Sequence, residues 1–89
     1  DNSAFLDSMA WAVFREGDHK EALRWQLKAL KHAKEDDPEI FLHLGEIYHA
    51  LKNDTKAREY LDKALTIKDV DAGIKTKIKT KIKALSPKK

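Results

Sequence analysis

Apolar side chains recur along this chain every three or four residues, the spacing that gathers them on one face of an α-helix. The pattern predicts four helices over about residues 4–15, 19–34, 38–51 and 55–67, and a fifth element over about residues 71–85. The inward-facing positions expected in the first four helices are Phe5, Leu6, Met9 and Val13, then Ala22, Leu23, Leu27, Leu30 and Ala33, then Ile40, Phe41, Leu44, Tyr48 and Leu51, and finally Ala57, Leu61, Ala64 and Leu65.

Capping and turn residues separate these helices. Gly17, followed by Asp18, tolerates the left-handed conformation that ends a helix, and Pro38 suits a first helical position. The expected N-caps are Asn2 or Ser3 for the first helix, Asp37 for the third and Asp71 for the last, and residues 52–54 form a turn.

The last element fits two patterns. Residues 74–82 alternate between β-branched residues and lysine, which is typical of a strand. Ile74, Ile78, Ile82 and Leu85 also fall on one helical stripe. Because a single strand after four helices would leave its backbone hydrogen bonds unmet, we expect a helix that ends before Ser86.

The apolar positions also repeat at a fixed spacing of 35 residues. A period of this length is typical of solenoids, in which each repeat buries its apolar face against its neighbours, and it favours a binding scaffold over a catalyst. The pairs that keep this register are Leu6 and Phe41, Met9 and Leu44, Ala10 and Gly45, Val13 and Tyr48, Ala22 and Ala57, Ala29 and Ala64, and Leu30 and Leu65.

These residues resemble the tetratricopeptide repeat, whose motif is W-x2-L-G-x2-Y followed by A-x3-F at about 34 residues per repeat. The stronger match is Phe41-x2-Leu44-Gly45-x2-Tyr48, Ala57-x3-Leu61 and Ala64, and the weaker one is Leu6-x2-Met9-Ala10-x2-Val13, Ala22-x3-Gln26 and Ala29. The resemblance implies one all-α domain, an α-solenoid wound as a right-handed superhelix. It would hold a first repeat over about residues 3–36, a second over about 37–70, a capping helix over about 71–85 and a basic tail over 86–89.

Two positions depart from the motif. Gln26 stands where an apolar residue is usual, and we expect neighbouring Trp25 to supply the missing bulk. Lys79 stands in the last helix where Gly45 stands in the second repeat. A lysine is tolerable there only if no further helix packs on that side, so the last helix is predicted to be a solvated cap.

Composition adds a charge asymmetry. The 89 residues carry a net charge of +3 and no cysteine, which excludes a disulfide framework and cysteine-ligated metal. Residues 1–67 hold 10 basic and 13 acidic residues (−3), whereas residues 68–89 hold 8 and 2 (+6). No apolar run approaches the ~20 residues of a membrane span. The chain begins at Asp1 without a methionine, and we interpret it as a fragment of a longer protein.

Enzymatic chemistry is not expected. His43, Glu46 and His49 share one helix, but the two histidines are six residues apart and point about 240° around it, whereas H-E-x-x-H needs them four apart. There is no glycine-rich phosphate loop and no nucleophile elbow. We therefore predict no catalytic residue, no metal and no cofactor.

In the resembled family, the concave surface comes largely from the first helix of each repeat. Alignment to the motif implies a concave-face binding site made of Asp7, Trp11, Phe14, Arg15, Leu42, His43, Glu46, His49, Thr76, Lys77, Thr80 and Lys83. One subset of the family holds a terminal carboxylate with a lysine–asparagine–asparagine–lysine–arginine clamp. Those places hold Asp7, Trp11, His43 or Glu46, Gly73 and Lys77 here, of which only Lys77 is compatible. Trp11 is the best anchor for a partner, because aromatic residues dominate binding hot spots.

The leading hypothesis is a non-catalytic scaffold for a protein or peptide partner. Two alternatives remain: a purely structural cap of a repeat array (or an artificial mini-repeat), and a binder of anionic surfaces or nucleic acid through the lysine-rich end. Nucleic acid is disfavoured because no aromatic residue interleaves the basic stretch. The apolar second helix, with Leu23, Trp25, Leu27 and Leu30, also suggests a weak homodimer through the first repeat.

Overall fold

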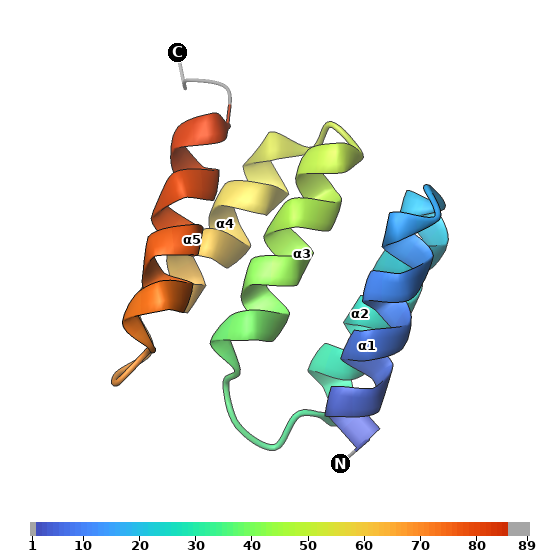
Figure 1. Ribbon diagram of the computed structural model, residues 1–89, viewed down its shortest axis with the longest axis horizontal. Coiled ribbons are helices and arrows are strands. Elements are labelled where there is room, and N and C mark those ends of the chain that lie inside the picture. The colour runs from blue at the N-terminus through green and yellow to red at the C-terminus, as the bar shows by residue number, and fades with distance from the viewer. Residues whose placement is uncertain (1, 86–89) are drawn as a thin grey trace.

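Five helices and no strand make up residues 2–85, the part of the chain that the computed structural model describes (Figure 1). The helices are α1 (Asn2–Arg15), α2 (His19–His32), α3 (Pro38–Ala50), α4 (Asp54–Leu65) and α5 (Ala72–Ala84). In Figure 1, α1, α3 and α5 lie side by side, with α2 behind α1 and α4 behind α3 and α5. The predicted all-α helical repeat fold is confirmed. None of these five helices has the length and apolar character that crossing a bilayer requires.

Side-chain caps fix most of the helix starts. Asp18, Asp37, Asn53 and Asp71 each accept a hydrogen bond from a backbone N–H in the first turn of the helix that follows, at 2.9 to 3.3 Å. The predicted N-caps Asp37 and Asp71 are confirmed. The prediction of Asn2 or Ser3 was wrong, because both residues already belong to α1 and Ser3 is buried.

Helix ends fall within two residues of the predicted ones. Gly17 has φ 95°, the left-handed conformation expected of it, and Lys52 adopts φ 65° in the predicted turn. α2 stops at His32 rather than near residue 34, because Ala33 is already extended and its N–H closes the last turn on Ala29 and Leu30 carbonyls.

The ambiguous stretch over residues 74–82 is helical, as predicted. Within α5, Ile78 is fully buried, and Ile74 and Ile82 pack against the same core. The lysines between them stay at the surface or at the groove described below. Leu85 is buried just after the helix ends. The predicted basic tail over 86–89 lies outside the described residues.

The core is centred on the α3–α4 pair. Leu44, Leu61 and Ile78 are fully buried and bring α3, α4 and α5 together. Gly45 permits the closest approach: a Cβ built there would lie 2.6 Å from both Cγ and Cδ2 of Leu61. The repeat motif requires a small residue at this position, and in this chain the reason is steric, because a larger side chain would overlap Leu61.

Three side-chain placements in α1 and α2 correct the sequence prediction. Phe5 is 63% exposed and Leu27 is 38% exposed, so neither belongs to the core stripe. The buried face of α1 instead centres on Ala10, and Phe5 lies about 140° away from it around the helix. Gln26 is itself fully buried, and Trp25 does not replace it: its ring lies under the Lys28 ammonium, 5.0 Å from Nζ.

Candidate interaction groove

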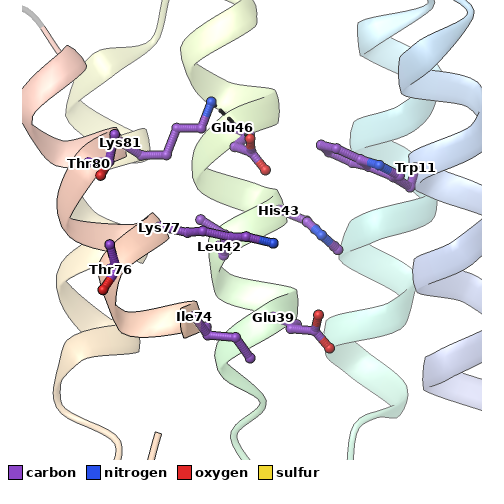
Figure 2. A pocket seen from close by; sticks show the side chains of 10 residues that line it. All are labelled: Trp11, Glu39, Leu42, His43, Glu46, Ile74, Thr76, Lys77, Thr80 and Lys81. Carbon is purple, nitrogen blue, oxygen red and sulfur yellow. Dashed lines mark ion pairs between the residues drawn. The ribbon is translucent and has the colours of Figure 1, made fainter. Parts of the chain in front are cut away.

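A groove of about 440 Å³ lies between α1, α3 and α5 (Figure 2). α1 contributes Trp11, α3 forms the floor, and one face of α5 forms the opposite wall. The lining residues are Trp11, Glu39, Leu42, His43, Glu46, Ile74, Thr76, Lys77, Thr80 and Lys81. We call this site the α1–α3–α5 groove.

The α5 wall presents lysine and threonine because of its helical spacing. Thr76 and Thr80 are one turn apart, and so are Lys77 and Lys81, so the four share one side of the helix. Lys81 Nζ pairs with Glu46 Oε2 at 3.0 Å, which ties the cap to α3 across the groove. Within residues 2–85 Lys77 forms no ion pair, and its side chain extends from α5 across α3 toward His43 (Figure 2).

The α1 wall is aromatic. The Trp11 ring stacks on the His43 imidazole, with 4.5 Å between ring centroids and 20° between the planes. On its other side Trp11 stacks against Phe14 at 4.9 Å, and Phe14 packs on His19 at 4.8 Å. Trp11 is therefore held between two rings, and such stacked pairs add to the stability that burial alone gives.

His43 is held from below by a carboxylate. Its Nδ1 lies 2.8 Å from Asp7 Oδ1, and the same oxygen accepts a hydrogen bond from Gln26 Nε2 at 2.6 Å. Burial lowers the pKa of His43, but the bond to Asp7 and the negative charges of Asp7, Glu46 and Glu39 outweigh it, so the pKa is raised above 6.5. Side chains from α1, α2 and α3 therefore meet at one carboxylate oxygen, Asp7 Oδ1.

Of the twelve residues predicted for the concave face, seven line the groove. They are Trp11, Leu42, His43, Glu46, Thr76, Lys77 and Thr80. Leu42 is only 5% exposed and forms floor rather than surface. Asp7 and Phe14 stand one layer behind, where they support His43 and Trp11.

The other three predicted residues do not line the groove. Arg15 and Lys83 are exposed elsewhere on α1 and α5. His49 lies at the end of α3 and bonds Asp54 Oδ1 at 2.9 Å through Nδ1. Because His43 and His49 bond different carboxylates, they do not form a shared site. Among residues 2–85 no three His, Cys, Asp or Glu side chains are placed to hold a metal ion.

Glu39, Ile74 and Lys81 line the groove but were missed by the sequence analysis. A signal for two of them was present, because Glu39 lies one turn before His43 and Lys81 one turn after Lys77. Ile74 was assigned wholly to the apolar stripe of the last helix. It packs on the core and also borders the groove.

Comparison with known protein families identifies the element that forms the groove floor. Residues 38–71, which comprise α3, α4 and the loop after them, match the family model described as the tetratricopeptide repeat. The match supports the assignment of the α3–α4 pair to the tetratricopeptide repeat family. Proteins with tetratricopeptide repeats are in general scaffolds for protein–protein interaction and are typically non-catalytic. Neither curated proteins nor solved structures gave a match to the chain.

Proposed function

We propose that this chain is a non-catalytic scaffold that binds a peptide or protein segment in the α1–α3–α5 groove. The arrangement carrying the proposal is the stacked pair of Trp11 and His43 facing Lys77, which has no ion-pair partner in the described part of the chain. The aromatic pair offers apolar area at low entropic cost, and the lysine offers a charge that needs no prior bond to be broken. We divide the chain accordingly into repeats over about residues 3–36 and 37–70 and a cap over about 71–85.

The groove favours an extended segment with an apolar side chain beside a hydrogen-bond acceptor. Leu42 and Ile74 give it an apolar floor and side, while Thr76 and Thr80 offer hydroxyl groups along α5. Glu46 and Lys81 already neutralise each other, so they add little net charge. Aromatic anchoring on Trp11 would supply most of the affinity, and Lys77 would set the orientation.

A displayed library of random peptides, selected against the purified chain, tests this function. A selected peptide should shift the indole resonance of Trp11 and the ring resonances of His43. It should bind at least tenfold more weakly to the Trp11→Ala and Lys77→Ala variants. Lys79→Ala is the matched control, because Lys79 is exposed on the same helix but outside the groove. Peptides that bind all variants equally, or perturb only residues outside the groove, would contradict the proposal.

A second candidate function uses the outer face of α5. Lys75, Lys79 and Lys83 are exposed and one turn apart, so they form a basic stripe away from the groove. Such a stripe favours an anionic surface, and its binding would weaken steeply with salt. Sedimentation of the chain with vesicles of anionic lipid, with Lys75→Glu and Lys79→Glu as variants, tests this candidate. A lack of salt-sensitive binding leaves α5 as a structural cap.

We also propose that the chain is the C-terminal part of a longer repeat array. The exposed apolar residues Phe5 and Leu27 lie in the first repeat, whereas the outer face of α5 is covered with lysine. This asymmetry fits an array that continues on the α1–α2 side and ends at α5. A parent reading frame without further repeats before residue 1 would contradict the proposal.

The same apolar residues support weak self-association of the isolated chain. Contact through Phe5 and Leu27 would bury apolar area and keep the two basic ends apart. Sedimentation velocity across a wide concentration range should show a dimer at high concentration that Phe5→Ser reduces. A chain that stays monomeric throughout removes this proposal and leaves the groove unaffected.

A further inference from the structure

The groove histidine is attached to a polar cluster that the repeat motif does not contain. Asp7 from α1, Gln26 from α2 and His43 from α3 meet at Asp7 Oδ1, with contacts of 2.6 and 2.8 Å. Gln26 is fully buried, and its Oε1 has no hydrogen-bond partner among residues 2–85. The only hydrogen bond of the Gln26 side chain within residues 2–85 is the one that Nε2 donates to Asp7. The Asp7 carboxylate is therefore the group that Gln26 stabilises.

We propose that Gln26 is a positioning residue for the groove: it holds Asp7, which fixes the tautomer and favours the charged form of His43. A carboxylate held by two donors at one oxygen has little freedom to rotate away from His43. A neutral His43 bonded this way carries its proton on Nδ1 and leaves Nε2 as an acceptor. Protonation turns Nε2 into a donor and gives the ring a positive charge.

The free nitrogen is the one available to a ligand. Nε2 makes no hydrogen bond to residues 2–85, and it is not among the fully buried atoms that lack a partner. His43 also lines the groove, next to Trp11, so a bound segment would meet Nε2 there. The charged ring would in addition attract the face of Trp11 on which it stacks.

Every charged group near His43 enters this balance. Asp7 faces it from α1, and Glu39 and Glu46 lie one turn away on α3. From α5, Lys77 and Lys81 share the groove, but Lys81 is paired with Glu46. α2 contributes the neutral Gln26. The carboxylates outnumber the unpaired lysine, so the surroundings favour the imidazolium.

The consequence for function rests on the proposed groove: a partner that accepts a hydrogen bond from Nε2 would bind more tightly at a pH below the pKa of His43. The position of Gln26, remote from the groove surface, makes it a determinant of that specificity without contact to the partner.

The test needs no partner and so stands apart from the proposed function. The pKa and tautomer of all four histidines are measured by NMR titration of the wild-type chain and of Gln26→Met and Asp7→Asn. The pKa of His43 should lie above the ordinary histidine value, and its neutral ring should carry the proton on Nδ1. Asp7→Asn should lower the pKa of His43, because it removes the carboxylate charge and the acceptor bonded to Nδ1, and Gln26→Met should lower it in the same direction by a smaller amount. His49, which bonds Asp54 instead, is the internal control and should not change.

A folded Gln26→Met variant with an unchanged His43 pKa and tautomer would overturn the proposal, since a merely structural Gln26 would affect only stability. A wild-type measurement covers the case in which that variant does not fold. The side-chain amide protons of Gln26 should exchange slowly and shift as Asp7 ionises. Rapid exchange without such a shift would equally refute the positioning role.

Discussion

Substituting Gly45 by alanine should destabilise this protein, although the same change in an ordinary helix is stabilising. Alanine is favoured over glycine by about 1 kcal/mol in a helix interior. Here the added Cβ would lie 2.6 Å from Leu61 Cγ and Cδ2 and 3.2 Å from Cδ1. Leu61 is fully buried within the α3–α4 core, so it cannot move aside without displacing other side chains. Overpacking costs about 1–3 kcal/mol, which leaves a net loss of about 1 kcal/mol.

The effect of Gly45→Ala on the free energy of unfolding should change sign once Leu61 is replaced by alanine. Leu61→Ala removes all three atoms that the new methyl group would meet, at a cost of about 2–5 kcal/mol for the cavity. In that background Gly45→Ala keeps its helix preference, meets no clash and fills part of the cavity, so it should stabilise by about 1 kcal/mol. The coupling between the two sites is then about 2 kcal/mol, within the range for residues in direct contact.

Urea unfolding followed by far-UV circular dichroism measures all four chains of this cycle. Sucrose can be added equally to each, because Leu61→Ala alone is expected to be marginal. In thermal unfolding, 1 kcal/mol corresponds to about 4–8 °C for a domain of this size. Stabilisation by Gly45→Ala in the wild-type background, or additivity of the two changes, would show that the close approach of α3 and α4 is not where the structure has it.

Three further outcomes follow from individual contacts. Lys79→Leu, at the α5 position that corresponds to the packed glycine, should change stability by less than about 0.5 kcal/mol in the same urea assay, since Lys79 is exposed; a loss above 1 kcal/mol would contradict the cap assignment. Because the folded pKa of His43 is raised, its stabilising contribution is complete below pH 6.5 and is lost as the pH rises through the folded value. The stability difference between the wild type and Asp7→Asn should therefore be larger at pH 6 than at pH 8.5, by about 1.4 kcal/mol for each unit of pKa difference, and equal values would refute the pair. Asp37→Ala removes the N-cap of α3 and should cost about 1 kcal/mol, whereas neighbouring Asp36→Ala should cost little, and similar values for both would show that the cap does not stabilise the helix.

The sequence predicted the five helices because the information needed for them is local. Apolar spacing identifies each helix, and an aspartate with a helical run after it identifies a start, as at Asp37 and Asp71. The last helix was recoverable from a pattern that also suited a strand, because a strand needs a partner and the chain offers none. Seven of the twelve residues taken from the alignment to the repeat motif line the α1–α3–α5 groove, and their role in binding stays a prediction.

The errors share a different cause. Phe5 was counted as core because it borders the apolar arc of α1, yet how wide an arc is covered depends on which helices pack there. Gln26 was expected to be replaced by Trp25, because burial of the amide depends on Asp7, a partner 19 residues away that no local pattern reveals. Glu39 and Lys81 were missed because the family alignment assigned groove positions one at a time. His43 and Lys77, which lie one turn from Glu39 and Lys81, were already among the predicted groove residues.

The residue that holds Asp7 also marks a difference between the α1–α2 and α3–α4 pairs. At the repeat spacing, Gln26 corresponds to Leu61, the residue that packs on Gly45. A leucine at 26 would match Leu61 and would remove a buried Oε1 that has no partner within the described residues, an arrangement that costs about 1–3 kcal/mol. It would also leave Asp7 without its second donor. A leucine at position 26 would therefore suit the core better, but it could not donate a hydrogen bond to Asp7 and so could not help to hold His43. One side chain cannot meet both requirements. The residue that departs from the repeat pattern, Gln26, lies in the core, whereas the side chain that it helps to position, His43, lies in the groove.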